Sequence, residues 1–421
     1  MTPPMTRCNH WCLSVSTPLA SLLAVGLFVA CGSQDTWGKP AITRRDSTGV
    51  QITENDLERL QATCVLGVSP TVTIGTAEGD EKYQLYRVFG ARRLSDGRIA
   101  VVNQGSQQLR FYDQQGRFVS QTGRAGEGPG EFRDAFHLWV LPGDTVWVGD
   151  YRPWRFLVFG PDGQWVRTVQ ADPMYINTAV TSVLDDGRFI LAERPRTTQS
   201  GTQFELRHLT LALHGVDGAL IDTIGTYPNG RWGRVDDTPG AVTLYPLFES
   251  FTRVTSTGSH IVVAHSSEPQ FSILSATDEV RVERIVRWTP GDRAISSGEI
   301  EAERQRLAEP YEDLDPGLRR RLLAPLVSQD RPVADQFPAF AAIAAGRDRR
   351  IWVREYGRPT TPDSHQWLAF DAEGRFQCRA TIPAFAVILE FGEDYLLVED
   401  SDELGVERVF QYSLSPPNDN D

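Results

Sequence analysis

The chain has 421 residues, a formal charge of −13 at pH 7 and 40% hydrophobic residues. This apolar content is typical of folded proteins and excludes an intrinsically disordered chain. Of the 42 basic residues only Lys39 and Lys82 are lysines. An acidic chain of this kind is a poor candidate for binding nucleic acid or anionic membrane surfaces.

Residues 1–30 are predicted to be a lipoprotein signal peptide. Arg7 precedes a mostly apolar run, PLASLLAVGLFVA, which is too short to span a membrane but suits a signal sequence. The junction FVA-CGS resembles a bacterial lipobox, with Phe28 where leucine is usual. Cys31 would then be lipidated and become the N-terminus, and ordinary secretion with cleavage nearby is the alternative. We expect a cell-envelope protein facing the periplasm or the exterior, whose membrane contact is the lipid anchor.

Residues 31–68 begin as a polar stretch and are interpreted as a tether. Cys8 and Cys12 leave with the signal peptide, so Cys64 and Cys378 remain beside the lipidated cysteine. Outside the cytoplasm these two could form a disulfide. The alternative is two buried thiols.

Residues 69–414 contain a repeat of short turns followed by apolar strands. The period is roughly 42–48 residues where nothing is inserted, the size of a four-stranded propeller blade. Alternating β-branched and aromatic residues between Gly/Asp turns favour strands over helices. Six units begin at Leu94, Leu141, Leu184, Thr255, Ala345 and Glu390. The fold class is therefore all-β, a six-bladed β-propeller.

The sixth unit ends after its third strand, near Leu414. The sequence PTVTIG, Pro70–Gly75, is predicted to supply the missing strand and close the ring, which removes an open sheet edge. Deletion of residues 69–76 would then destabilise the whole ring. Residues 415–421 are expected to be a flexible tail.

Residues 289–338, between the fourth and fifth blades, have a helical pattern. Ser296 with Glu299 three residues later forms a capping box, and Asp315 followed by Pro316 is a second helix start. Two short helices are expected beside the channel mouth. They would act as a lid or partner-docking hairpin, or as a clasp that only stabilises the loops.

The segment GRAGEGPGEF, residues 123–132, is glycine-rich but does not fit a phosphate loop. It lacks G-x-G-x-x-G and Gly-Lys-Ser/Thr, and a strand follows it instead of a helix. Pro129 also removes one backbone donor. We interpret it as the connection between the first two blades, with Phe132 filling the gap between them.

GEGPGEF followed by TVWVGDYRPWRFLVFGPDGQWVRTV resembles an NHL repeat, with Asp150 at its aspartate position. The first unit is a looser copy with Asn103 in that place, and VWVGDYRPWRF also resembles the YWTD type. The overall plan resembles the bacterial 6-bladed β-propeller lipoproteins with NHL-like (TolB/YWTD-like) repeats. This resemblance implies the fold and says little about activity.

In such a blade, strands A to D run outward from the channel. The A–B and C–D turns lie on one face, and here they are short. The B–C and D–A connections lie on the other face and include all the long loops, so functional residues are expected there. The ligand-binding candidates on this face are Arg124, Glu127, Arg133, Tyr151, Arg152, Trp154, Arg194, Arg231, Trp232, Arg354 and Tyr356. Arginines mixed with aromatics could receive a carboxylate, a peptide or a sugar, or they could pair with acidic residues on adjacent loops.

Local catalytic motifs are absent from the sequence. There is no H-E-x-x-H, no Cys/His ligand set and no G-x-S-x-G, so catalytic residues stay unknown and no cofactor or metal ligand is predicted. His137, on an inner strand, and His265, at the end of a B strand, are candidates for the channel rim. Six-bladed propellers also include metal-dependent lactonases and lyases whose ligands come from several blades, so Ca²⁺ or Zn²⁺ in the channel stays open.

Three functions follow from these features. The first is a lipid-anchored, monomeric binding module that holds a protein, peptide or glycan on the B–C/D–A face. The second is a metal-dependent lyase or hydrolase, and the third is a scaffold in an envelope complex. The scarcity of catalytic motifs favours the binding module over the enzyme.

Overall fold

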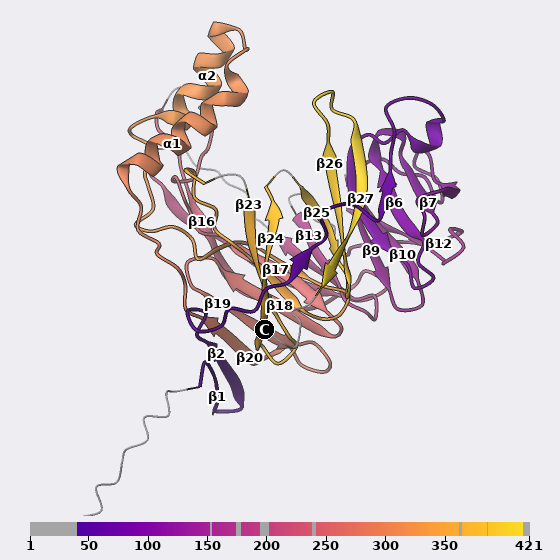
Figure 1. Ribbon diagram of the computed structural model, residues 1–421, viewed down its shortest axis with the longest axis horizontal. Coiled ribbons are helices and arrows are strands. Elements are labelled where there is room, and N and C mark those ends of the chain that lie inside the picture. The colour runs from indigo at the N-terminus through magenta and orange to yellow at the C-terminus, as the bar shows by residue number, and fades with distance from the viewer. Residues whose placement is uncertain are drawn as a thin grey trace, which may run out of the picture. The chain divides into compact units, whose positions relative to one another are not determined.

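The computed structural model describes residues 40–151, 154–173, 178–193, 202–237, 241–361, 364–384 and 386–415. These residues form six antiparallel blades arranged as a β-propeller (Figure 1). The fold predicted from the repeat is confirmed. Among the described residues, no helix is both long and apolar enough to cross a membrane.

The first three blades use four consecutive strands each, with the innermost strand first. Blade 1 consists of β5 (Val88–Arg93), β6 (Ile99–Asn103), β7 (Gln108–Tyr112) and β8 (Phe118–Thr122). Blade 2 consists of β9 (Ala135–Leu141), β10 (Thr145–Asp150), β11 (Arg155–Phe159) and β12 (Trp165–Gln170). Blade 3 consists of β13 (Thr178–Val183), β14 (Phe189–Glu193), β15 (Glu205–His214) and β16 (Leu220–Trp232).

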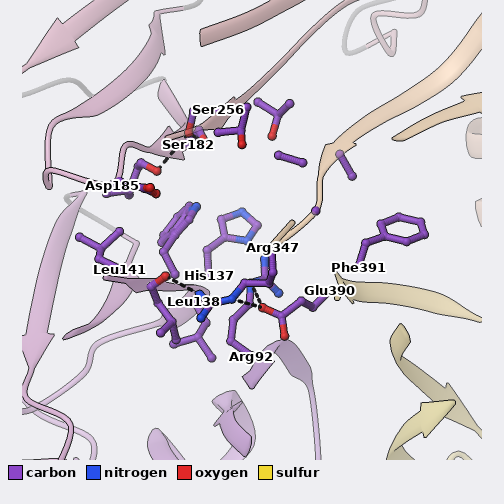
Figure 2. A pocket seen from close by; sticks show the side chains of 18 of the residues that line it. Arg92, His137, Leu138, Leu141, Ser182, Asp185, Ser256, Arg347, Glu390 and Phe391 are labelled. Atoms are coloured by element: carbon purple, nitrogen blue, oxygen red, sulfur yellow. Dashed lines mark hydrogen bonds and ion pairs between the residues drawn. The ribbon is translucent and has the colours of Figure 1, made fainter. Parts of the chain in front are cut away.

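The last three blades follow the same order, and the inner strands of all six surround a central channel (Figure 2). Blade 4 consists of β17 (Thr252–Thr257), β18 (His260–His265), β19 (Gln270–Ser275) and β20 (Arg281–Trp288). Blade 5 consists of β21 (Phe340–Ala345), β22 (Ile351–Glu355), β23 (Ser364–Phe370) and β24 (Phe376–Pro383). Blade 6 consists of β25 (Val387–Phe391), β26 (Tyr395–Ser401), β27 (Glu407–Ser415) and, from the N-terminal part of the chain, β4 (Val72–Ile74).

Closure of the ring by an N-terminal strand is confirmed. β4 pairs antiparallel with β27, with Ile74 opposite Val409. The Ile74 side chain is fully buried against blades 1 and 6. The first blade and the last are thus joined by residues that precede both.

The expectation of a tether over residues 31–68 is wrong from Pro40 onward, and residues 31–39 lie outside the described part. β1 (Ile42–Ser47) and β2 (Val50–Asn55) form a hairpin, and β2 extends blade 4 by pairing parallel with β20. β3 (Val65–Leu66) then joins β27 of blade 6. The physical reason is apolar burial within this polar-looking stretch, because Ile52 and Leu57 are only 6% and 5% exposed.

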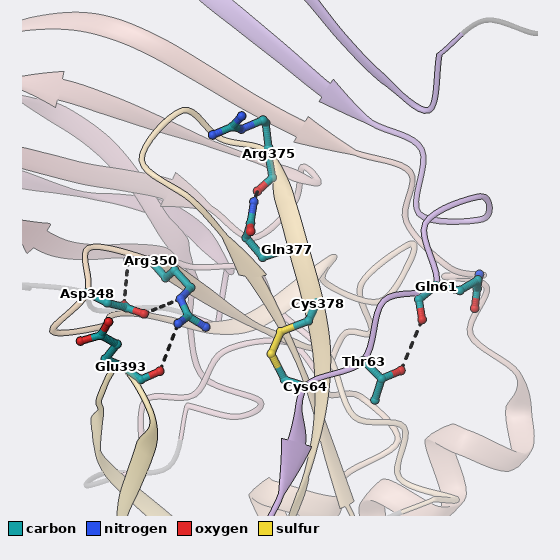
Figure 3. Close-up of a disulfide and its surroundings, with 9 residues drawn as sticks. All are labelled: Gln61, Thr63, Cys64, Asp348, Arg350, Arg375, Gln377, Cys378 and Glu393. Atoms are coloured by element: carbon teal, nitrogen blue, oxygen red, sulfur yellow. Dashed lines mark hydrogen bonds and ion pairs between the residues drawn. A yellow bond between two sulfur atoms is a disulfide. The ribbon is translucent and has the colours of Figure 1, made fainter. Parts of the chain in front are cut away.

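A disulfide joins Cys64 to Cys378 of β24 (Figure 3). Their Cα atoms are 5.4 Å apart and 314 residues apart in sequence. Beside it the Cys64 amide donates to the Arg379 carbonyl at 2.9 Å, and the Arg379 amide donates to the Ala62 carbonyl at 2.8 Å. Residues 40–74, which we call the N-terminal strap, therefore attach in turn to blades 4, 5 and 6.

Apolar clusters fill the spaces between neighbouring blades. Phe132, at the end of the glycine-rich segment, is fully buried between blades 1 and 2 and lies 5.8 Å from Phe159 by ring centroid. Gly123 has φ +85°, and a Cβ there would lie 2.3 Å from the Phe132 ring. The predicted role of this segment as a connection between blades is therefore confirmed, and its first glycine is required by the approach of Phe132.

The insertion between blades 4 and 5 contains α1 (Ser297–Ala308) and α2 (Pro316–Val327), which project from one side of the ring (Figure 1). Both predicted N-caps, Ser296 with its capping box and Asp315, are present. The insertion packs on a small apolar cluster that contains Leu247, Phe248 and Phe337. Its base is bonded to neighbouring loops, since the Leu247 amide donates to the Pro332 carbonyl and Glu299 of α1 pairs with Arg358.

Candidate functional site

Several sequence candidates cannot be placed. Cys31, Arg152 and Arg194 lie outside the described residues. The other candidates on the B–C/D–A face fall into two groups, one beside blades 1 and 2 and one beside blades 3 to 5.

The charged candidates of the first group pair within their own loop. Arg124 donates to Glu131 at 2.7 Å, and Arg133 lies 2.9 Å from Glu127. Glu131 also accepts from the Gly128 amide at 2.9 Å, and these bonds hold the pKa of its carboxyl below the usual range. The first group thus matches the alternative of local ion pairs, which are weak when exposed.

The aromatic candidates of the first group belong to the interior of blade 2. Trp154 is 6% exposed and packs with Trp147 and Phe156. Tyr151 contacts Trp154 edge to face at 5.3 Å. The Trp154 ring is therefore a core group, and the expectation that it offers a surface for a ligand is wrong.

In the second group, Arg231 is also paired. Its guanidinium lies 2.9 Å from Glu249, which accepts from the Arg231 amide as well. Trp232 packs edge to face against Tyr245 at 5.2 Å and donates from its indole to the Asn229 carbonyl. These residues shape the connection between blades 3 and 4.

Tyr356 borders a cleft of about 440 Å³, which we call the face cleft. The cleft lies between the two ends of the helical insertion and the B–C connection of blade 5. Its main lining residues are Arg293, Phe337, Glu355, Tyr356, Arg358 and Ser364. Tyr356 stacks on Phe337 at 5.5 Å, which gives the cleft an aromatic wall. The neighbouring candidate, Arg354, is partly buried, and burial lowers the pKa of its guanidinium.

Glu355 is a candidate ligand-binding residue of the face cleft that the sequence analysis did not select. Its nearest charged partner is Arg379, at 3.6 Å, and its carboxyl makes no hydrogen bond to the described part of the chain. Burial raises the pKa of this carboxyl, and Arg379 opposes the shift. Arg358, by contrast, is held by Glu299 at 2.6 Å and by Asp292 at 3.1 Å. Glu355 is therefore a carboxyl with hydrogen-bonding capacity left over.

A second cavity, of about 500 Å³, lies in the central channel (Figure 2). Its walls come from the ends of the inner strands and the A–B turns that follow them. We call it the channel cavity. It lies toward the A–B turns, so the B–C/D–A face is not the only place where a ligand fits.

His137 lines the channel cavity, as predicted, whereas His265 does not. The His137 ring stacks parallel to Trp154 at 6.3 Å and contacts Trp139 at 5.5 Å. Burial, and then the nearby charge of Arg92, lower the pKa of His137 to about 4. The imidazole is thus neutral at pH 7. His265 bonds to Ser267 at 2.7 Å.

Three charged groups from three blades lie close together in the channel cavity. Glu390 of β25 is 6% exposed, and its Oε1 lies 3.8 Å from the Nε atoms of both Arg92 and Arg347. Arg347 also donates to the Val140 carbonyl of blade 2 at 2.9 Å, so it reaches across the channel from blade 5. Burial raises the pKa of Glu390 although both arginines oppose that shift.

No group of three or more His, Cys, Asp or Glu side chains that could hold a metal is found within the described ranges. The sequence reading missed Arg92, Arg347 and Glu390 because it treated the short A–B turns as structural. The sequence did contain an indication of this site, because charged residues close to the ends of inner strands face a channel that otherwise favours small or apolar side chains.

Residues 89–201 match the family described as 6-bladed beta-propeller. No curated protein matches the chain. Among solved structures, a member of the duf4221 family from Bacteroides vulgatus is 10% identical, with 85% of this chain and 99% of that one covered and a TM-score of 0.47. A protein of unknown function from Bacteroides thetaiotaomicron is 10% identical, with coverage of 84% and 76% and a TM-score of 0.41.

Streptogramin B lyase is also 10% identical, with coverage of 85% and 98% and a TM-score of 0.35. Structural similarity at these levels says nothing about what this chain binds or converts. Residues 89–201 are thus similar in sequence to the 6-bladed beta-propeller family, and the ring of six blades is the fold that this similarity implies.

Proposed function

We propose that this chain is an extracytoplasmic binding protein that holds a glycan or peptide, alone or as part of a partner protein, in the face cleft. The observation that carries the proposal is Glu355. This carboxyl lines the cleft and makes no hydrogen bond within the described residues, and its one nearby cation is 3.6 Å away. A half-buried carboxyl with free acceptor capacity favours a ligand that brings hydroxyl or amine donors.

The rest of the cleft suits the same ligands. Tyr356 and Phe337 supply an aromatic wall, and Ser364, Thr361 and Gln366 add small polar groups. Pockets that bind small ligands combine an apolar surface with a few placed polar groups. Aromatic faces also pack well against the C–H faces of sugars and against peptide side chains.

The proposed location is the cell envelope, with Cys31 as the lipid anchor and the ring as a monomer. The signal peptide predicted for residues 1–30 supports this proposal. So does the pairing of Cys64 with Cys378, because stable disulfides belong to oxidising compartments outside the cytoplasm. Replacement of Cys31 by Ala should release the protein from membranes, and continued retention would contradict the anchor.

The binding proposal is tested by capture from envelope extracts and by glycan and peptide arrays, with the purified chain and its Glu355→Gln variant. Glu355→Gln removes the charge and half of the acceptor capacity with almost no change of shape, so capture should fall at least tenfold. Glu279→Gln is the matched control, because Glu279 is exposed in the C–D turn of blade 4 on the opposite face. Equal capture by the wild type and Glu355→Gln would show that the face cleft is not the site.

A further inference from the structure

The channel cavity has features of a second binding site, on residues that the proposed function does not use. We propose that it binds a small hydroxylated carboxylate of the size of a sugar acid. The proposal stands on three observations: an excess of positive charge, an unsatisfied buried acceptor, and a cavity of matching size. None of the three depends on the face cleft.

The first observation is the charge balance inside the cavity. Two guanidinium groups, Arg92 and Arg347, face one carboxylate, Glu390 (Figure 2). At the rim, Arg349 and Asp185 contribute one charge of each sign. The cavity thus keeps one positive charge beyond what its own acids neutralise, in a lining where the apolar side chains of Leu138 and Leu141 lie beside polar groups. A charge in such surroundings is stabilised by a counter-ion, and a guanidinium fits a carboxylate closely.

The second observation is the unsatisfied oxygen of Glu390. Its Oε2 accepts from the Arg93 amide and from the Tyr395 hydroxyl, both at 2.8 Å. Its Oε1 is buried and has no hydrogen-bond partner, since both arginine Nε atoms are 3.8 Å away. Buried acceptors are normally satisfied. A hydroxyl donor on the ligand would satisfy Oε1 while the ligand's carboxylate meets the guanidinium groups.

The third observation is space and its polar lining. A water occupies about 30 Å³ of liquid, so a cavity of about 500 Å³ holds a molecule of a dozen non-hydrogen atoms with room for waters. His137 lines the cavity without a hydrogen bond to any described residue. The Ser182 and Ser256 hydroxyls also line the cavity, where they bond to one another. Neutral donors and acceptors of this kind suit sugar hydroxyls.

The test measures the melting temperature and the calorimetric affinity of the whole chain with defined probes. D-glucuronate, D-gluconate and lactate carry a carboxylate and hydroxyls, and D-glucose carries hydroxyls alone. At least one hydroxy acid should raise the melting temperature in a saturable way, and D-glucose should not. Arg347→Gln should weaken that binding at least tenfold, whereas Arg281→Gln, an exposed arginine on an outer strand, should leave it unchanged.

Three results would overturn the proposal. They are no response to any of the three hydroxy acids at millimolar concentration, an equal response to D-glucose, and unchanged binding by Arg347→Gln. If Arg347→Gln does not fold, NMR of the wild type still tests the location of the site, because binding in the cavity must shift the signals of the His137 ring. Because Glu355 is in the other cleft, Glu355→Gln should bind the hydroxy acid normally, which separates this site from the proposed function.

Discussion

Asp150 and Arg155 form a buried ion pair across the B–C connection of blade 2, with Oδ2 and Nε 2.8 Å apart. Asp150 is 1% exposed, and its carboxylate also accepts from the Arg133 and Asp134 amides at 3.0 and 2.6 Å. Arg155 in turn donates to the Glu131 carbonyl at 3.0 Å. The pair therefore fixes the glycine-rich connection to the blade that follows it.

Replacement of Asp150 by Ala should lower the free energy of unfolding by about 3–5 kcal/mol, because it leaves the buried Arg155 guanidinium without a carboxylate and two amides without their acceptor. Denaturant unfolding of the purified chain measures this loss. Asp162→Ala is the control, since Asp162 is exposed and accepts one turn amide. Similar losses in the two variants would contradict the assigned role of the buried pair.

Asn103, at the equivalent position in blade 1, shows why the repeat could be recognised in the sequence. Asn103 accepts from the Tyr86 amide at 2.7 Å, so it fixes the strand entry as Asp150 does. Because the blades share one strand order, residues that fix the entry of a strand recur at similar positions in successive blades. This recurrence gives the sequence a detectable period. The part of the N-terminal strap that precedes β4 has no counterpart in the repeat. Its pairing with blades 4 and 5 depends on contacts hundreds of residues apart, which a local pattern does not record.

Ile74 should be essential for ring closure. Its side chain is fully buried where β4 completes blade 6, so Ile74→Ala should cost about 2–5 kcal/mol of unfolding free energy. Because β4 joins the last blade to the first, the loss should appear in a single transition of the whole ring. Thr73→Ala, on the exposed side of the same strand, should have little effect, and an early separate transition in Ile74→Ala would argue against a cooperative ring.

The Cys64–Cys378 disulfide should stabilise the attachment of the strap. It closes a loop across 314 residues, and a native disulfide typically contributes about 2–4 kcal/mol. The double variant Cys64→Ser/Cys378→Ser should therefore melt at a lower temperature than the oxidised wild type. Reductant should move the wild type to the same value and leave the double variant unchanged. A wild type whose melting temperature does not respond, although thiol titration shows full reduction, would contradict this prediction.

The candidate sites were harder to predict than the fold. The sequence identified Tyr356 and His137, which line the two cavities, but it also selected Trp154, whose ring turned out to be buried. Arginine and aromatic residues on loops are common, and whether each is paired or buried depends on where its neighbours lie in space, in the same loop or in another blade. Glu390 illustrates the limit, since its partners Arg92 and Arg347 lie in blade 1 and blade 5 and are brought together only by the closed ring.

Glu399 of β26 should make the stability of the ring depend on pH. Burial, followed by the nearby charges of Glu407 and Asp400, raises the pKa of its carboxyl from 4.5 to about 7. Between pH 4.5 and about pH 7, the Glu399 carboxyl is deprotonated in the unfolded chain and still protonated in the folded chain. The stabilisation is therefore complete below about pH 4.5 and is lost as the pH rises through about 7.

Glu399→Gln cannot ionise and should remove this dependence. We expect the variant and the wild type to have similar melting temperatures at pH 5, and the variant to be the more stable of the two at pH 8. Other titrating groups affect both proteins equally, so the difference between the two curves is the readout. Glu403→Gln is the control, because Glu403 is exposed in the turn after β26, and its curve should follow the wild type. If the Glu399→Gln and wild-type curves run parallel from pH 5 to 8, Glu399 titrates as an ordinary surface carboxyl and the like charges around it are well solvated.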